Sequence, residues 1–376
     1  MKPELRFLEF EEKWSYKKLK DLLKVHSGRD YKHLEPGEIP VYGTGGYMLS
    51  VSDYLSNDDA IGIGRKGTIN KPYLLKAPFW TVDTLFYCTP REEVDLYFLL
   101  SLFKKINWKK YDESTGVPSL SKVNIEKIKV YSCGLEEQRK IGDFFRKLDR
   151  QIELEEQKLE KLEEQKKGYM QKVFSQELRF KDENGNEYPE WEDKKLLNVI
   201  AIQNGYAFKS NLFSERGMPI IRITDINKST VKKGTVYYPE SIEINERFKI
   251  KQYDILIAMS GATTGKVGKY ISEKPSLLNQ RIGKFVMKKG TDNNFMFTYL
   301  NSLYFKKELS KLLVAGAQPN ISSQDIENIN LFIPINEEQR KIGEFFNELD
   351  ELIEKQSSKI GVLKQRKKGF LQKMFV

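Results

Sequence analysis

Two long stretches of the chain carry apolar residues at alternating spacings of four and three. Residues 136–174 contain one such run, and residues 337–375 contain another. This spacing is a heptad pattern, which predicts long helices with an apolar seam. Each helix of 39 residues would be roughly 58 Å long at 1.5 Å per residue. The predicted seam residues are Phe145, Leu148, Ile152, Leu159, Leu162, Phe346, Leu349, Ile353, Ile360 and Leu363.

The two stretches are copies of one sequence. At an offset of 201 residues, 21 of their 39 positions are identical, from EEQRKIG at the start to the KKG and QK near the end. The same two seam positions are polar in both copies, and polar seam residues can fix register and partner. They are Glu155 and Gln356 at one position, and Lys166 and Lys367 at the other.

The duplication extends into the segments before the helices. The residues of 118–121 match those of 319–322 at the same offset, and Leu5-Arg6-Phe7 before Trp14 resembles Leu178-Arg179-Phe180 before Trp191. The tryptophans are 177 residues apart, so the second segment carries 201 − 177 = 24 more residues. The ends of the repeat are therefore alike, whereas its middle has diverged.

The repeat indicates two globular domains and two helices. Helices in one chain most simply pair with each other, here antiparallel with a globular domain at each end. The alternative is that each helix packs on its own domain as an amphipathic arm. The predicted division is a first domain at 1–135, a helix at 136–174, a linker at 175–191, a second domain at 192–336 and a helix at 337–376.

The globular segments have a mixed pattern. Short runs bounded by turn residues predict strands at 60–64, 85–88, 219–223 and 254–258, and glycines predict turns at 43–46 and 205–206. Longer runs predict helices at 96–106 and 295–313. The predicted fold class is α+β, with two mixed α/β domains separated by a long antiparallel two-helix coiled coil.

Composition indicates the cellular compartment and the charge of a partner. No stretch approaches 18 uncharged apolar residues, and the N-terminus lacks an apolar signal region, so we expect neither a membrane span nor export. The two cysteines, Cys88 and Cys133, fit a reducing cytoplasm rather than a disulfide framework. The net charge of +10 suggests an anionic partner, although excess lysine also serves solubility. Segments 1–135 and 192–336 carry +3 and +8, so the charge gathers mainly in the second.

Motifs for catalysis or cofactors are weak. Residues 62–67 match G-x-G-x-x-G, but Pro72 follows where a nucleotide-binding helix would begin. Residues 261–266 are one residue too short for a phosphate loop, and Val267 replaces its Ser or Thr. Both fit turns at similar places in the two domains. His26 and His33 are expected to be ordinary surface histidines, so we predict no catalytic residue, no metal and no cofactor in this chain.

Several loops combine basic, amide and aromatic residues. Lys and Arg bind phosphates, whereas Arg, Asn and Gln read base edges. The candidate DNA-binding residues of the first segment are Thr44, Arg65, Lys66, Lys71, Tyr73, Lys109, Lys110 and Tyr111. Those of the second are Asn204, Tyr206, Lys209, Ser210, Arg222, Ser260, Lys266, Asn279, Gln280, Arg281, Gln318 and Asn320.

The chain resembles the specificity (S) subunits of type I restriction–modification systems. The resemblance rests on the duplicated helix motifs, the LRF…W openings, and runs such as IPVYGTGGY, FWTVDTLFY, NGYAFKS, IRITDI, SGATTGKVG and LLNQRIG. It covers essentially the whole chain. It implies two target-recognition domains that each read half of a split, asymmetric double-stranded DNA site, and helices that set the gap between the halves.

The resemblance also implies partners. Two modification subunits would dock on this chain, bind S-adenosylmethionine and methylate adenine at N6. Restriction subunits would add ATP- and Mg²⁺-dependent translocation and cleavage, so catalysis would belong to the partners. The open alternative is an assembly scaffold whose domains bind protein without reading DNA sequence. The failed motifs disfavour a nuclease or an ATPase.

Overall fold

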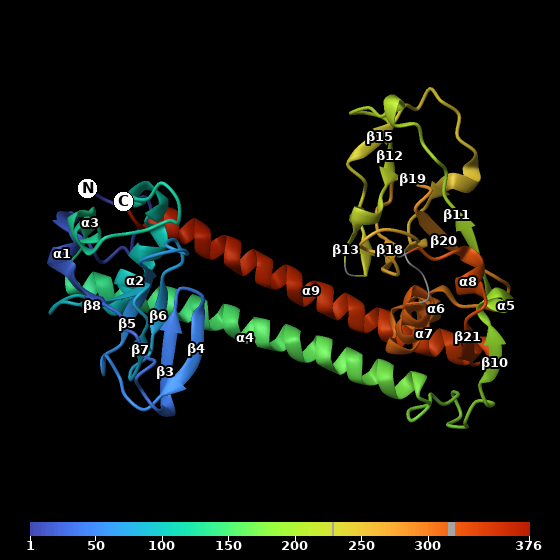
Figure 1. The fold of residues 1–376 in the computed structure, drawn as a ribbon, viewed down its shortest axis with the longest axis horizontal. Coiled ribbons are helices and arrows are strands. Elements are labelled where there is room, and N and C mark those ends of the chain that lie inside the picture. The colour runs from blue at the N-terminus through green and yellow to red at the C-terminus, as the bar shows by residue number, and fades with distance from the viewer. Residues whose placement is uncertain (228, 315–319) are drawn as a thin grey trace. The chain divides into compact units, whose positions relative to one another are not determined.

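The chain folds into two compact units in the computed structural model, which describes residues 1–227, 229–314 and 320–376. The first unit comprises Met1–Lys158 and Gln356–Val376, and the second comprises Leu159–Lys355. Both chain termini belong to the first unit (Figure 1). The division falls within both long helices, so each unit contains one globular segment and a part of each helix.

The first globular segment consists of three small sheets and short helices. Their orders are β1-β9, β2-β8-β5-β6 and β4-β3-β7. The elements are β1 (Ser15–Lys18), α1 (Leu19–Leu22), β2 (Leu23–Ser27), β3 (Pro36–Gly43), β4 (Gly46–Val51), β5 (Ala60–Gly64), β6 (Tyr73–Leu75), β7 (Trp80–Thr81), β8 (Leu85–Pro90), α2 (Leu96–Lys105), η1 (Trp108–Tyr111), α3 (Lys122–Lys127) and β9 (Lys129–Ser132).

The second globular segment contains the same sheets with additions. The first part of the segment consists of β10 (Glu192–Lys195), α5 (Leu196–Val199), β11 (Ile200–Asn204), η2 (Ser210–Leu212), β12 (Met218–Ile221), η3 (Ile223–Asp225), β13 (Ile226–Asn227), β14 (Thr230–Val231) and β15 (Val236–Tyr238). The remainder consists of η4 (Glu246–Phe248), β16 (Lys249–Ile250), β17 (Ile255–Ala258), β18 (Val267–Tyr270), β19 (Ser276–Leu278), β20 (Ile282–Met287), α6 (Asn293–Asn301), α7 (Leu303–Val314), α8 (Ser323–Glu327) and β21 (Asn330–Ile333).

The strand pairings match between the two segments. The run β2-β8-β5-β6 corresponds to β11-β20-β17-β18, and every neighbouring pair in both runs is antiparallel. The parallel pair β3·β7 corresponds to β12·β19. The second segment adds β13, β14 and β16, and the smaller sheet with β12, β15 and β19 lies away from α6 and α7 (Figure 1). The predicted α+β class is confirmed.

Two long helices follow the globular segments, α4 (Leu135–Phe174) and α9 (Asn336–Met374). Both are rich in Glu, Lys and Gln, which favour helix, and neither contains proline. Each begins with acidic residues and has a lysine in its last turn, which suits the helix dipole. All ten residues predicted for the seam are buried or half-buried.

In the first unit, the start of α4 pairs with the end of α9. Phe144 packs edge-to-face against Phe370 with ring centroids 5.1 Å apart, and Asp149 forms an ion pair with Lys367. Further along, Lys359 is 2.5 Å from Glu155. As the residue numbers of the contacting residues rise along α4, those of their partners in α9 fall, so the two helix segments run antiparallel.

In the second unit, the end of α4 pairs in the same way with the start of α9. Lys166 forms an ion pair with Asp350, and Tyr169 packs against Phe345 at 5.3 Å. The two ion pairs are equivalent in the repeat, because Asp350 is Asp149 plus 201 and Lys367 is Lys166 plus 201, so the partners are exchanged between the helices. The half-buried seam lysines therefore each have an equivalent aspartate partner, one in each unit.

A buried glutamate joins each long helix to its own globular segment. In the first unit, Arg6 donates to both oxygens of Glu137 at 2.7 Å, and the Trp14 indole donates to the same carboxylate at 3.2 Å. This explains why the LRF…W opening and the helix start are repeated together.

The second unit repeats the arrangement. Arg179 donates to both oxygens of Glu338 at 2.8 and 2.9 Å, and the Trp191 indole donates at 3.1 Å. The second glutamate of each EEQ motif is thus a structural acceptor shared by an arginine and a tryptophan that lie far away in the sequence.

The end of each long helix completes an apolar core. Phe375, just after α9, packs against Trp14 and Phe98 with centroid separations of 6.0 and 5.4 Å. In the second unit, Phe174 at the end of α4 packs against Trp191 and Phe295 at 6.2 and 5.9 Å. Each globular core therefore includes residues from both long helices.

Two predicted elements differ from the structure. The helix predicted at 295–313 is wrong as one element, because α6 and α7 are separated at Ser302, whose backbone is extended. Ser302 is fully buried, and its hydroxyl accepts the amide of Phe305 and so begins the second helix. The strand predicted at 219–223 ends at Ile221, since Arg222 caps the short 3₁₀ helix η3 that follows.

Candidate nucleic-acid interface

Three backbone segments meet at one edge of the first globular segment. After β2, the amide of Arg29 donates to the carbonyl of Thr81 at 2.8 Å, and after β5 the amide of Arg65 donates to Thr84 at 2.8 Å. Gly28 lies against the same segment, and a Cβ there would be 2.0 Å from the carbonyl oxygen of Val82. Only glycine fits this approach, which holds the loop after β2 beside the β7–β8 connection.

The second globular segment has the same junction. The amide of Tyr206 donates to Leu278 at 2.8 Å, and that of Met259 donates to Arg281 at 2.9 Å. A Cβ on Gly205 would lie 2.1 Å from the carbonyl oxygen of Asn279. These bonds assign Arg29 and Tyr206 to equivalent positions of the two segments.

A fourth strand-like segment completes each junction. The amide of Leu120 donates to Arg65 at 2.9 Å, and a bridge pairs Lys66 with Ser119. Correspondingly, the amide of Ile321 donates to Met259 at 3.0 Å, and a bridge pairs Ser260 with Asn320.

The glycine turns expected at similar places do correspond. Gly67 and Gly261 each follow the bridged residue and have φ of +85° and +83°, a conformation that favours glycine. Residues 65–70 and 260–265 are turns rather than helix starts, so neither run has the helix that a phosphate-binding motif would need.

The matched backbone carries different side chains. At six equivalent positions, the first and second segments have Ser27 and Asn204, Arg29 and Tyr206, Lys66 and Ser260, Asp83 and Gln280, Thr84 and Arg281, and Ser119 and Asn320. We call these six pairs the reading positions. Their side chains are exposed or half-buried in both segments, so both surfaces present polar groups to solvent.

The structure brings most candidates of the second segment together. Six of the predicted residues belong to this junction or are bridged to it, and Asn279 lies at its centre; Gln318 lies outside the described residues. The amide oxygen of Asn204 accepts the hydroxyl of Ser323 at 2.8 Å. Tyr206 is 41% exposed, and its ring packs against Phe208 and Phe248.

Lys71 and Lys266 are also equivalent. Gly62 and Leu256 are equivalent positions, and they pair with Tyr73 and Gly268 respectively. Lys71 lies two residues before Tyr73, and Lys266 lies two residues before Gly268. Both lysines are exposed. The candidate cations of the two hairpins therefore occupy one site of the shared frame.

Other candidates lie apart from the reading positions or have structural contacts. The hydroxyl of Tyr73 donates to the Gly43 carbonyl at 2.6 Å, and burial raises the pKa of Tyr73. Thr44 is half-buried in the β3–β4 turn, and Tyr111 packs on the core beside η1, where Lys109 and Lys110 are exposed.

Three candidates of the second segment belong to its smaller sheet or its surroundings. Arg222, directly after β12, donates to the Thr235 hydroxyl at 3.1 Å, and its amide donates to Asp225 at 2.8 Å. Lys209 and Ser210 are exposed at the start of η2. The structure does not bring these three residues into the junction.

Sequence reasoning missed five residues of the first junction, namely Ser27, Arg29, Asp83, Thr84 and Ser119. A signal was available, because Gly28 and Gly205 each lie 14 residues after the tryptophan of their segment (28 − 14 and 205 − 191). Aligning on those glycines places Arg29 against Tyr206. The letters around them differ, so the correspondence becomes clear only from the backbone hydrogen bonds.

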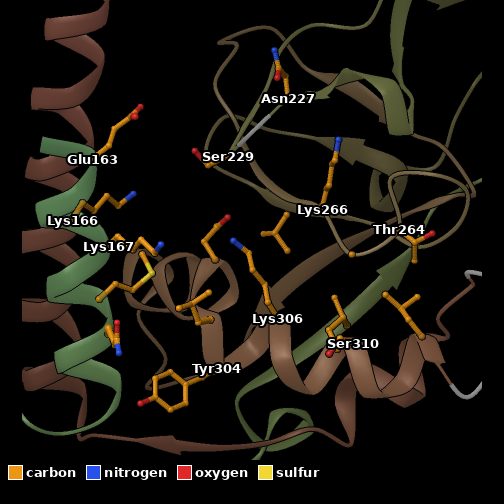
Figure 2. A pocket seen from close by; sticks show the side chains of 18 residues that line it. Glu163, Lys166, Lys167, Asn227, Ser229, Thr264, Lys266, Tyr304, Lys306 and Ser310 are labelled. Atoms are coloured by element: carbon orange, nitrogen blue, oxygen red, sulfur yellow. The ribbon is translucent and has the colours of Figure 1, made fainter. Parts of the chain in front are cut away.

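A basic cleft lies elsewhere in the second unit. Figure 2 shows Lys166 and Lys167 on α4 across from Lys266 and from Lys306 on α7. Met170 contributes to its apolar lining. Lys166 is already paired with Asp350, so part of the cleft's charge is neutralised within the chain.

Groups that could support other chemistry are structural where they are described. His26 stacks on Tyr87 at 4.7 Å, and burial together with Lys122 and Lys24 lowers its pKa. Cys88 and Cys133 are free and buried, and burial raises the pKa of both thiols. Within the described ranges, no three His, Cys, Asp or Glu residues are grouped to hold a metal, and no helix is long and apolar enough to cross a membrane.

Comparisons with known proteins identify the repeat. Residues 11–164 and 188–364 match the model of the type I restriction modification DNA specificity domain. The MjaVIII specificity subunit of Methanocaldococcus jannaschii is 33% identical over 330 residues, which cover 83% of this chain and 75% of that protein. The EcoAI specificity subunit of Escherichia coli is 31% identical over 183 residues, covering 46% and 30%.

A solved structure has the same fold over the whole chain. The type I restriction–modification S subunit from M. genitalium matches with a TM-score of 0.71 at 17% identity, covering 100% of this chain and 99% of that one. Both of these relatives are specificity subunits of type I restriction enzymes. This chain therefore belongs to the family of type I restriction–modification specificity subunits.

Proposed function

We propose that each globular segment reads one half of a split, asymmetric double-stranded DNA site. In this proposal, residues 1–135 and 192–336 are the two target-recognition domains, and the reading positions contact DNA. The observation that carries the proposal is the pair of junctions with matched backbone bonds and different side chains. A shared frame keeps the geometry of docking, while different side chains select different bases.

The side-chain types support contact with base edges. The second domain presents Asn204, Gln280, Arg281 and Asn320, and Asn, Gln and Arg are the residues that bind adenine and guanine edges in the major groove. The first domain presents Arg29 and basic or hydroxyl groups instead. The two halves of the site should therefore differ in sequence rather than form a palindrome.

The long helices serve as a spacer in this proposal. The antiparallel pairing inside each unit, with its repeated lysine–aspartate pair, gives the helices a defined register. A stiff helical spacer would fix the distance between the half-sites. Half-sites about one helical turn of DNA apart are the geometry of other two-part DNA readers.

The same helices and domains would dock two modification subunits, and restriction subunits would join that complex. A chain with a TM-score of 0.57 to this one comes from a study of the assembly of a type I system. The partners would bind S-adenosylmethionine, ATP and Mg²⁺, and would methylate an adenine flipped out of the duplex. We further propose that this chain works in the cytoplasm.

The test is a domain exchange with a methylation readout. Residues 192–336 are replaced by the matching segment of a relative, and modified bases are sequenced in cells that also express the modification subunit. We expect methylation at a site in which one half changes and the other half is kept. A change in both halves would contradict modular reading, and the absence of any fixed sequence would favour a protein-binding scaffold.

A further inference from the structure

The reading junction of the first domain contains a basic hollow. Its lining includes Arg65, Lys66 and Lys122, together with the hydroxyls of Ser27, Ser119 and Ser121, over the ring of Phe86. All these residues belong to the first unit. Three cations and the hydroxyls of Ser27 and Ser119 around one hollow are suited to a phosphate group, which accepts hydrogen bonds at several oxygens.

The cations are not fully engaged by the protein. Among the described residues, the Arg65 guanidinium donates only to the backbone carbonyl of Asp83, at 3.5 Å, and it lies 5.7 Å from the Phe86 ring. Lys122 has a long, exposed contact of 3.8 Å with Glu126, which contributes little in water. Arg65 and Lys66 are both exposed, so an anion in the hollow would meet them without displacing a buried ion pair.

Acidic residues are present as well. The hydroxyl of Ser121 donates to Glu113 at 3.0 Å, and Glu126 lies within reach of Lys122. The second domain also has carboxylates at the equivalent place, with Asp325 accepting from Ser322 and Glu327 accepting from the amide of Ile202. The carboxylates therefore do not distinguish the domains.

The two domains differ in the cations at this place. The backbone bonds assign Arg65 to Met259 and Lys66 to Ser260, and the matching N-caps of α3 and α8 assign Lys122 to Ser323. All three positive charges of the first hollow are replaced by neutral residues in the second. There, Ser323 instead donates to the amide oxygen of Asn204.

We propose that the hollow of the first domain binds a phosphate of the DNA backbone, while the equivalent place in the second domain contacts DNA without charge. This inference rests on the proposed function. In this inference, Lys66 and Lys122 bind a phosphate and so position the duplex without selecting a sequence. The bases are selected in the first domain by the remaining reading positions, above all by Arg29.

Salt dependence tests the assignment. Each phosphate contact that is lost makes the plot of log K against log salt concentration less steep by about 0.9. The double variant Lys66→Ser and Lys122→Ser gives the two lysine positions of the hollow the residues of the second domain. The full chain in complex with its modification subunit is titrated against duplex DNA by fluorescence anisotropy at several salt concentrations.

We expect the double variant to make the slope less steep by about 0.9, because one phosphate contact is lost, with the methylated sequence unchanged. The variant Lys66→Arg with Lys122→Arg keeps the charge and should keep the slope. Lys127→Ser, at the other end of α3 and exposed, is the matched control and should also leave it unchanged.

Two results would overturn the inference. One is an unchanged slope in the Lys→Ser double variant. The other is a relaxed base preference in one half-site, which would make these lysines base readers. Both leave the proposed function in place, because the complex still selects a sequence. A wild-type complex that prefers no sequence over competitor DNA would instead refute the proposed function itself.

Discussion

Replacing Glu137 by alanine removes the acceptor on which the Arg6 guanidinium and the Trp14 indole converge. The side chains of Arg6 and Glu137 are only 11% and 4% exposed, so the loss leaves a nearly buried cation and an indole N–H without their partner. Removing one partner of a buried ion pair costs about 3–5 kcal/mol. That is a large share of the roughly 5–15 kcal/mol that stabilises an ordinary domain.

The neighbouring glutamate is a matched control. Glu136 is 77% exposed and pairs with Arg139 one helical turn away, an exposed contact worth at most about 1 kcal/mol. Glu136→Ala should therefore be nearly neutral. In the second unit, Glu338→Ala should act like Glu137→Ala but on its own unit, since its carboxylate is fully buried and binds Arg179 and Trp191.

Hydrogen exchange measured by mass spectrometry separates the two units. In Glu137→Ala, the free energy of the opening reactions through which the amides of β1, β9 and the start of α4 exchange should fall by about 3–5 kcal/mol. Amides of β10 and β21 should be unaffected, and Glu338→Ala should show the opposite distribution. Equal effects of Glu136→Ala and Glu137→Ala, within about 1 kcal/mol, would refute the reasoning that the buried carboxylate holds the helix to its domain.

Three other predictions concern the helices. Gly142→Ala should destabilise the first unit by about 1–3 kcal/mol in urea unfolding, because its Cβ would lie 2.2 Å from Asp95 Oδ1; Gly168→Ala, with nothing within 4 Å, should stabilise by up to about 1 kcal/mol. Burial opposes ionisation of Asp149, but its hydrogen bond with Lys367 prevails and its pKa lies below the ordinary value. The stability from this pair is thus present above the ordinary carboxyl pKa and lost as pH falls through the lowered one, and Asp149→Asn should flatten that acid limb of a denaturation series. Four residues inserted into α4 add about 6 Å and should change the gap between methylated half-sites, and an unchanged gap in sequenced modified bases would exclude the spacer.

The elements found from sequence are those with a local cause. The heptad spacing of α4 and α9 repeats over many turns, so its period indicates helix without knowledge of any distant contact. The break between α6 and α7 could not be found this way, because the apolar spacing continues across Ser302. That break depends on a buried hydroxyl bonded to the amide of Phe305, which is a tertiary feature.

The residues of the candidate interface likewise differ in whether a local sequence pattern indicates them. In the second domain, amide and aromatic residues are dense around 204–206 and 279–281, and composition alone drew attention to them. In the first domain, the equivalent Ser27 and Asp83 have no distinctive type. Their position follows from backbone bonds between segments about 50 residues apart, such as Arg29 to Thr81, and no local pattern encodes such a distance.

The repeated motifs of the two copies have a structural role rather than a role in the candidate interface. EEQRKIG is the strongest repeat in the chain, yet two of its polar residues are buried in structural contacts: Glu137 binds Arg6, and Gln138 accepts the amide of Asp95, the residue that caps α2. The reading positions, by contrast, share a backbone and differ in side chain. Identity between the two copies thus marks the frame that attaches each domain to its helices, and difference marks the surface on which the two domains act separately. In the proposed function, either half of the target can change without disturbing the other because these two sets of residues do not overlap.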